Sequence, residues 1–164
     1  VHATSHQKPL RTTQLQDADR ALSMSAATTT SCPCHSGRKY KRCCAPLHRG
    51  AKEKGAAAVM RARFSAYSLA LCNYIISTTH PKGPHFQDDL VRWHLQLQDF
   101  ASQTLFEGLE LLEEKEGPLQ AQVAFRATLS QQGCDASFSE RSLFVLHENR
   151  WLYHSGEKLT ARAH

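Results

Sequence analysis

The sequence predicts an α+β domain that follows a small cysteine-rich unit. Four of the six cysteines fall within residues 32–44. Apolar residues then recur every three or four positions over residues 56–79 and 87–102, which is the spacing of a buried helix face. From residue 105 onward apolar and polar residues alternate, as they do in half-buried strands. Helices followed by a four-stranded antiparallel meander form an α+β architecture.

Length and composition set the domain organisation. A chain of 164 residues, 41% of them hydrophobic, suffices for one domain plus appendages. We expect a flexible polar tail over 1–30, a cysteine knuckle over 31–48, a basic linker over 49–55, the main domain over 56–157 and a C-terminal tail over 158–164. No run of about 18 apolar residues occurs, so no transmembrane segment is expected.

The chain begins with Val1 rather than Met. We therefore expect either a fragment or a product from which a leader has been removed. This favours an organelle, a mitochondrion or a chloroplast, over the cytoplasm. Secretion is not expected, because secreted scaffolds spread their cysteines along the chain to form disulfides.

The clustered cysteines have the spacing C-x-C-x8-C-C and are Cys32, Cys34, Cys43 and Cys44. One tight turn can bring two close pairs of thiols into a tetrahedron, which a structural zinc ion requires. Disulfides are the alternative, although adjacent cysteines bond poorly to each other and C-x-C pairs form strained rings. Four thiolates leave zinc no position for water, so the ion would not be catalytic. The distant Cys72 and Cys134 are expected to be small buried apolar residues.

The first helix is expected over residues 56–79 and the second over 87–102. The apolar stripe of the first helix comprises Met60, Phe64, Tyr67, Leu71 and Ile75. The segment HPKGP at 80–84 ends this helix. Asp88 and Asp89 are placed in the first turn of the second helix, where the helix dipole favours them. The buried face of the second helix would comprise Leu90, Trp93 or His94, Leu97, and Phe100 or Ala101.

The clearest strand lies over residues 119–129, where six apolar residues alternate without a break. A strand marked by Leu105, Leu109 and Leu111 precedes it, with a turn at 114–118. After a turn at 131–133, a long strand is expected over 136–146, and residues 148–149 turn into a last strand over 150–154. We expect Phe64 and Tyr67 of the first helix to pack on Val123, Phe125 and Phe144.

The cysteine segment also carries a family resemblance. Its pattern C-x-C-x-S-G-x-x-Y-x-x-C-C resembles the SEC-C zinc knuckle of the translocation motor SecA and of YchJ-like proteins. Further segments resemble the YchJ-like family: APLH at 45–48, MRARFSAY at 60–67, TTHP at 78–81, ERSLF at 140–144 and RWLY at 150–153. The resemblance implies a knuckle fused to a nuclear-transport-factor-2-like cone, in which a curved antiparallel sheet wraps a long helix. His35 stands where the family usually has Gly, and it can adopt a positive φ at some strain.

Positive charge is concentrated around the knuckle. Residues 38–63 hold nine Lys or Arg and one acid, a net charge of +8, which leaves −3 for the rest of a chain whose total is +5. Such a face suggests an anionic partner, although part of the charge would balance zinc-bound thiolates. The expected partner-binding residues are Arg38, Lys39, Lys41, Arg42, Arg49 and Lys52. We expect them on one exposed face.

A cone of this kind has a mouth that can hold a ligand. The polar residues that could line it are Tyr67, His80, His94, Glu140, Arg141 and Tyr153. Glu140 shares a strand face with Phe138 and Phe144, and we expect it to form an ion pair with Arg61 or Arg63. His80 is expected to cap the end of the first helix. We identify no catalytic residue, because the sequence contains no nucleophile–base motif and no glycine-rich phosphate loop.

Together these features favour a non-enzymatic zinc-binding adaptor or accessory subunit that docks on a large assembly through its basic knuckle face. The SecA knuckle, which this segment resembles, is associated with binding partner proteins and ribosomes. One alternative is a small-ligand-binding protein, or an isomerase- or hydrolase-type enzyme, that uses the cone. The other is a protein that binds ribosomal RNA, although Tyr40 is the one aromatic residue of the basic segment before the first helix that is suited to base stacking. Sequence-specific DNA binding is not expected.

Overall fold

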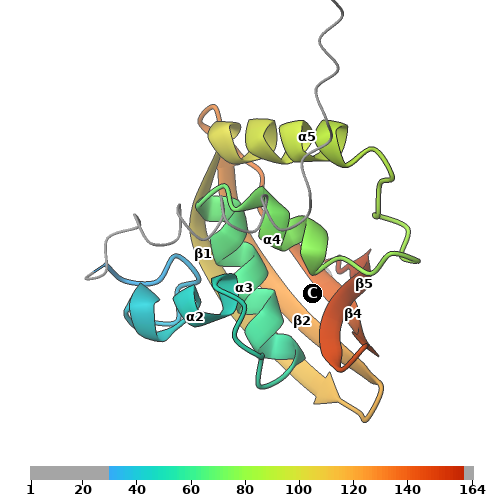
Figure 1. Cartoon of the computed structure of the whole chain (residues 1–164). Helices are drawn as coiled ribbons and strands as arrows, with labels where there is room; N and C mark the ends of the chain where they lie inside the picture. The colour runs from blue at the N-terminus through green and yellow to red at the C-terminus, as the bar shows by residue number, and fades with distance from the viewer. Residues whose placement is uncertain (1–29, 161–164) are drawn as a thin grey trace, which may run out of the picture.

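The computed structural model describes residues 30–160, in which an antiparallel sheet wraps around helices (Figure 1). The strands are β1 (Thr104–Glu116), β2 (Gln120–Gln131), β3 (Cys134–Asp135), β4 (Phe138–His147) and β5 (Arg150–Lys158). Their order is β1-β2-β4-β5, with the short β3 paired to β2. This confirms the predicted α+β fold with its antiparallel meander. The predicted tail over 1–30 lies outside the described residues except for Thr30, as do residues 161–164.

The strand pattern buries one face of the sheet. In β2 the buried alternate residues are Ala121, Val123, Phe125, Ala127 and Leu129, as predicted. Leu119, which was expected to begin this series, lies before the strand and is 65% exposed. The β4–β5 hairpin turns at Glu148 and Asn149, whose φ angles of 48° and 63° match the right-handed twist of the paired strands.

The first helix differs from the prediction because it is broken into α3 (Ala56–Ser68) and α4 (Cys72–Ser77). Ala70 adopts a left-handed conformation, with φ 55°. The Leu71 amide donates to the Ala66 carbonyl, and the Ala70 amide to the Tyr67 carbonyl. This is a Schellman ending with Ala in the position that Gly usually occupies. Leu71 is fully buried, and its burial holds the chain in this turn.

The break divides the predicted apolar stripe between two cores. Met60 and Phe64 join the sheet residues in one cluster, whereas Leu71 and Ile75 join the other. The predicted packing of Phe64 on Val123, Phe125 and Phe144 is confirmed, since all four share the first cluster. Tyr67 instead lies against the rings of Phe100 and Phe106.

The second predicted helix is α5 (Leu90–Gln103), which lies across one end of α3 and the sheet (Figure 1). Asp89 is its N-cap and accepts a hydrogen bond from the Arg92 amide, so Asp88 and Asp89 precede the first turn rather than lying in it. Trp93 and Leu97 are buried as predicted. Leu90 and Phe100 are 41% and 36% exposed, because the buried face of α5 is narrower than the apolar face predicted from the sequence.

Candidate functional site

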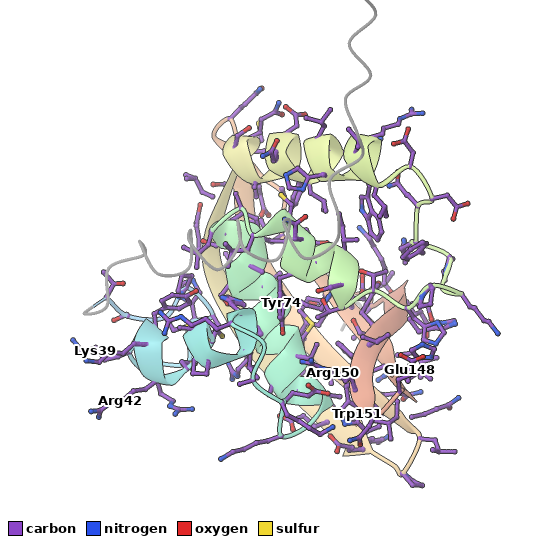
Figure 2. All side chains as sticks on the ribbon, in the orientation of Figure 1. Lys39, Arg42, Tyr74, Glu148, Arg150 and Trp151 are labelled. Atoms are coloured by element: carbon purple, nitrogen blue, oxygen red, sulfur yellow. The ribbon has the colours of Figure 1, made fainter. Side chains whose placement is uncertain are left out.

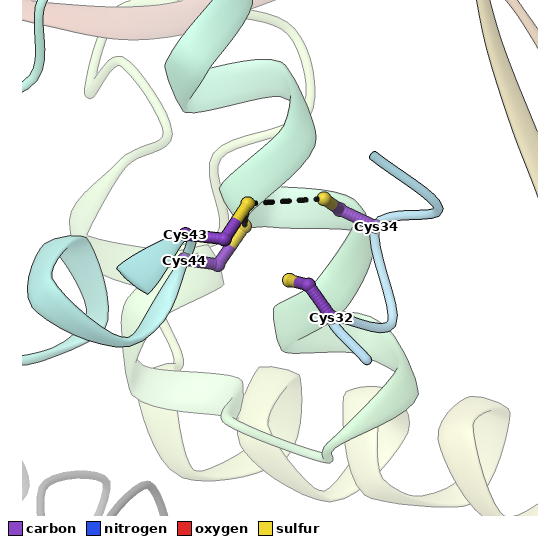
Figure 3. Close-up of side chains that lie close together, drawn as sticks. All are labelled: Cys32, Cys34, Cys43 and Cys44. Atoms are coloured by element: carbon purple, nitrogen blue, oxygen red, sulfur yellow. Dashed lines mark hydrogen bonds between the residues drawn. The ribbon is translucent and has the colours of Figure 1, made fainter. Parts of the chain in front are cut away.

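The four clustered cysteines converge on one point beside α3 (Figure 3). Their sulfur atoms all lie within 4.8 Å of one another. The Cys34 Sγ to Cys43 Sγ distance is 3.5 Å, and the Cys43 Sγ to Cys44 Sγ distance is 3.9 Å. Thiolates bound tetrahedrally to zinc at about 2.3 Å lie about 3.8 Å apart. All six cysteines are free thiols, so the disulfide alternative is not found, and the donor set fits a tetrahedral metal ion.

Backbone hydrogen bonds build the turn that gathers these thiols. The Cys32 amide donates to the Arg38 carbonyl at 2.8 Å, and the His35 amide donates to the Cys32 carbonyl at 3.1 Å. His35 has a φ of 59°, so this position does take the positive φ that the Gly usual in the family would adopt without strain. The following 3-10 helix η1 (Tyr40–Arg42) and helix α2 (Ala45–His48) then present Cys43 and Cys44 from the opposite side.

Polar groups around the thiols suit an anionic cluster. The Ser36 hydroxyl lies 3.2 Å from Cys43 Sγ, and the Arg61 guanidinium donates to the Cys34 carbonyl at 3.2 Å. Hydrogen bonds from Cys32 and Cys44 lower the pKa of the Cys34 thiol, whereas hydrogen bonding with Cys32 raises the pKa of Cys44. Thiols this close share their protons, and a cation is needed before all four can ionise together.

His48 connects the knuckle to the main domain. Its Nε2 lies 2.8 Å from the Ala62 carbonyl of α3, which can only accept, so Nε2 carries the proton. Its Nδ1 therefore accepts from the hydroxyl of Tyr40, at 2.7 Å. Tyr74 of α4 lies edge-on to the imidazole ring, with 4.8 Å between the ring centroids. The knuckle is thus held to α3 and α4 by buried, directional contacts.

The basic residues proposed for partner binding are all exposed. Lys39 and Arg42 project together from the outer end of the knuckle (Figure 2). Arg38 also donates to the Arg42 carbonyl at 2.5 Å, which helps to close η1. Lys52 donates to the Asn149 carbonyl in the β4–β5 turn, so it also ties the linker to the sheet. The placement of all six on a single face stays a prediction.

A cavity, separate from the cysteine cluster, lies between α3, α5 and the concave face of the sheet. The cavity has a volume of about 380 Å³ and is walled largely by aromatic rings. These rings belong to Phe64, Tyr67, Trp93, Phe100, Phe106, Phe125, Phe138 and Tyr153. Its polar wall is formed by Arg63, Thr79, Glu140 and Ser142, with His85 and Gln87 from the loop before α5. The cavity is therefore apolar with a small convergent polar group, as ligand sites usually are.

Glu140 is held at this polar wall by two hydroxyls. The Tyr153 hydroxyl and the Ser142 hydroxyl both donate to its Oε1 atom, at 3.1 Å and 2.9 Å. Gly156 makes room for this arrangement, because a Cβ there would lie 2.0 Å from Glu140 Oε1. Burial raises the pKa of Tyr153 well above its usual value, and the Glu140 charge adds to the shift, so the phenol keeps its proton.

Two parts of the chain match models of known protein families. A family model described as YchJ, middle NTF2-like domain, matches residues 55–156, and a SEC-C motif model matches residues 29–46. The chain belongs to the YchJ family. A UPF0225 protein of Haemophilus influenzae strain PittEE is 38% identical over 132 residues, which are 79% of each chain. A UPF0225 protein of Deinococcus radiodurans is 37% identical over 124 residues, 74% of this chain and 85% of that one.

Two solved structures of SEC-C motif containing proteins resemble this chain. The solution structure of a SEC-C motif containing protein from Rhodopseudomonas palustris superposes with a TM-score of 0.69 at 31% identity, covering 80% of this chain and 100% of that one. The crystal structure of a SEC-C motif containing protein from Psychrobacter arcticus gives a TM-score of 0.66 at 24% identity, covering 83% and 86%. The second likeness shows the shared fold alone.

The predicted ion pair of Glu140 with Arg61 or Arg63 is wrong. No ion pair among residues 30–160 of this YchJ-family chain involves Glu140. Arg63 is buried and donates from Nη1 to the Ile75 carbonyl and to two threonine hydroxyls, those of Thr78 and Thr79. Its guanidinium lies 4.7 Å from the centroid of the Tyr153 ring. The broken helix supplies these acceptors, which satisfy the cation without a carboxylate.

Three of the six suggested pocket residues, Tyr67, Glu140 and Tyr153, line the cavity, whereas His80, His94 and Arg141 do not. The His80 amide donates to the Tyr153 carbonyl and its Nδ1 accepts from the Lys82 amide, so its side chain does not cap α4. His94 lies 3.2 Å from the Asn73 side-chain oxygen. Arg141 reaches Glu113 at 3.3 Å from the opposite face of β4.

Sequence reasoning missed several residues that hold this YchJ-family chain together. Glu53 is buried, accepts from the Trp151 amide at 2.7 Å and lies 3.4 Å from the Arg150 guanidinium. A single acid among nine cations was a signal that it has a structural partner. Arg63 and Ser142 gave no such signal, because only the fold reveals their neighbours. Cys134 is exposed in β3, contrary to expectation, because its hairpin extends beyond the core.

Proposed function

We propose that this protein is a zinc-binding accessory subunit whose basic knuckle face docks on an anionic surface of a protein assembly. Zinc would be held by Cys32, Cys34, Cys43 and Cys44. The ion would be structural, since four thiolates leave no coordination position for a reactant. Its chemistry would be to fix the knuckle, so that the lysine and arginine side chains of η1 and of the turn before it point outward from a rigid base.

The observation that carries the docking proposal is the group of exposed cations at 38–42. Arg38, Lys39, Lys41 and Arg42 are all exposed, while Tyr40 between them is buried and anchors the segment. Four cations within five residues raise the local potential and attract carboxylate or phosphate groups. A rigid basic surface of this kind gives fast, salt-sensitive association with an acidic partner.

Charge compensation of the metal does not use up these four cations. A zinc ion with four thiolates carries a formal charge of about −2. Arg61, which donates to the Cys34 carbonyl from α3, already supplies one positive charge next to the cluster. At least three of the four charges at 38–42 are then in excess of what the metal centre needs. We assign this excess to partner binding.

Reversing charge on the knuckle tests the proposal. Lys41→Glu/Arg42→Glu should lose partner proteins recovered by affinity purification at low salt, while elemental analysis still gives one zinc per chain. The matched control is Lys82→Glu/Arg126→Glu, which changes net charge equally at two exposed positions away from the knuckle and should keep the partners. Recovery from wild type should also fall between about 0.1 M and 1 M salt, because the Debye length shrinks from about 10 Å to 3 Å.

Nuclease treatment distinguishes the proposed protein partner from RNA. Recovery that survives nuclease but fails in the knuckle variant supports docking on protein. Loss of all partners on nuclease treatment would replace the proposal with RNA binding through phosphate contacts. Equal recovery from both charge-reversed variants would show that the basic knuckle does not dock.

A further inference from the structure

We propose that the cavity between α3, α5 and the sheet binds a small uncharged molecule with an apolar ring body and one hydrogen-bond donor, which Glu140 accepts. This inference does not depend on zinc or on knuckle docking. It rests on three observations: the size and aromatic walls of the cavity, an unused oxygen of Glu140, and the balance of charge around that carboxylate.

The cavity is partly open to solvent, and it is larger than the voids that close packing leaves in a protein core. Interiors of proteins are packed as densely as organic crystals, with few voids larger than a water molecule. A cavity of about 150 Å³ lined by apolar side chains is enough to hold benzene. The volume of about 380 Å³ found here would accept a two-ring compound.

Aromatic residues from both helices and from the sheet form the walls of this cavity. Phe64 and Tyr67 come from α3, Phe100 from α5 and Phe106 from β1. Phe106 meets Phe64 and Phe100 edge-on, at centroid distances of 5.6 Å and 5.9 Å. Rings held in this way offer both faces and edges to a planar apolar guest.

One oxygen of Glu140 remains available to a ligand. Both hydroxyl donors, from Tyr153 and Ser142, go to Oε1, and no donor within the described part of the chain reaches Oε2. No buried side-chain oxygen in that part lacks a partner, so Oε2 is accessible rather than enclosed. Because Glu140 lines the cavity, Oε2 can receive a hydrogen bond from a molecule inside it.

The charges around the cavity favour an uncharged guest. Arg63 is 5% exposed and lies over the Tyr153 ring, whose hydroxyl contacts Glu140. One cation and one carboxylate, joined through one ring, leave the polar wall close to neutral. A charged ligand would lose its hydration without a counter-charge of its own, whereas a hydroxyl or amide N–H satisfies Oε2 at lower cost.

Two matched probes test this inference on the zinc-loaded full chain. 2-Naphthol has two rings and one hydroxyl donor, and 2-methoxynaphthalene has the same rings with the donor removed. In NMR titrations, 2-naphthol should bind at least about tenfold more tightly, because it alone can donate to the carboxylate. Cross-relaxation between the naphthol ring and the side chains of Phe64 and Phe106 should place it in the cavity.

Variants of β4 identify the acceptor. Glu140→Gln can keep an oxygen for Tyr153 and Ser142 while placing an amide N–H₂ where Oε2 stood, so the preference for 2-naphthol over 2-methoxynaphthalene should vanish or reverse. Arg141→Gln, the neighbouring residue on the opposite face of the strand, should leave both affinities unchanged. Failure of both probes to bind wild type at about 1 mM would overturn the inference. So would equal wild-type affinities for the two probes, or a bound naphthol without cross-relaxation to the cavity rings, and neither result requires a folded variant.

Discussion

Acid should weaken the junction between knuckle and cone through a single imidazole, that of His48. Burial lowers the pKa of His48 from 6.5 to about 4 in the folded protein. The neutral ring already donates to Ala62 and accepts from Tyr40, so a second proton at Nδ1 would end the hydrogen bond that Nδ1 accepts and would place a positive charge in a buried site. The unfolded chain has no such restriction, and it binds a proton near the ordinary histidine pKa.

The size of the effect follows from these two pKa values. Because the folded pKa is the lower one, the unfolded state binds more protons between them, and stability falls with decreasing pH. The contribution of His48 is fully present above about pH 6.5 and is lost as pH falls through about 4. Between about pH 7 and pH 5 the loss amounts to about 2 kcal/mol, since each pKa unit is worth about 1.4 kcal/mol.

Urea denaturation of wild type and His48→Gln, followed by tryptophan fluorescence at several pH values, measures this contribution. The glutamine has no titrating group, and acid acts on the four clustered thiols of both proteins alike. The free energy of unfolding of wild type should therefore fall by about 2 kcal/mol more than that of the variant between about pH 7 and pH 5. Parallel pH profiles for the two proteins would refute the assigned role of the buried imidazole.

Three further changes test the core, the helix break and the metal centre. Phe125→Ala should lower the free energy of unfolding by about 3–5 kcal/mol, because the ring is 3% exposed in the sheet core; an unchanged denaturation midpoint would contradict this placement. Ala70→Gly should raise the melting temperature, since glycine relieves the left-handed strain of about 1 kcal/mol, and a lower melting temperature would show that the turn carries no strain. Cys43→Ser should abolish stoichiometric zinc by elemental analysis while Cys72→Ser keeps it, and zinc bound equally by both would rule out the proposed ligand set.

Local patterns were sufficient to predict the sheet and the thiol cluster. The alternation of apolar and polar residues predicts strand β2, because side chains of a strand point in turn to the buried and the exposed face of the sheet. The cysteine cluster is predicted by spacing, because two close pairs of cysteines separated by eight residues can meet through local folding of one short segment. The left-handed φ of 59° at His35 is also set locally, because it is a property of the turn that holds the first two cysteines.

Features set by distant contacts could not be predicted in this way. Ala70 is an ordinary helix former, and no Gly or Pro beside it predicts the end of a helix. The turn forms because Leu71 becomes fully buried there. That break then moves Thr78 and Thr79 into reach of Arg63, which removes the need for an ion pair with Glu140. The error about Glu140 is therefore a consequence of the error about the helix.

The remaining prediction concerns how far loss of zinc spreads through the fold. Treated as a separate unit, the knuckle would unfold alone and leave the cone intact. However, Cys34 and Cys44 share one buried cluster with Ala66 of α3, Ile75 of α4 and Trp93 of α5.

Loosening the thiols should therefore expose the core beneath α5, where Trp93 lies, before the sheet core that contains Trp151. Two single-tryptophan proteins report on these clusters separately: Trp151→Phe leaves Trp93, and Trp93→Phe leaves Trp151. On chelation of zinc, the Trp93 signal should shift to a lower denaturation midpoint by more than the Trp151 signal does. Unchanged midpoints for both tryptophans would show that the knuckle and cone fold independently despite their shared contacts.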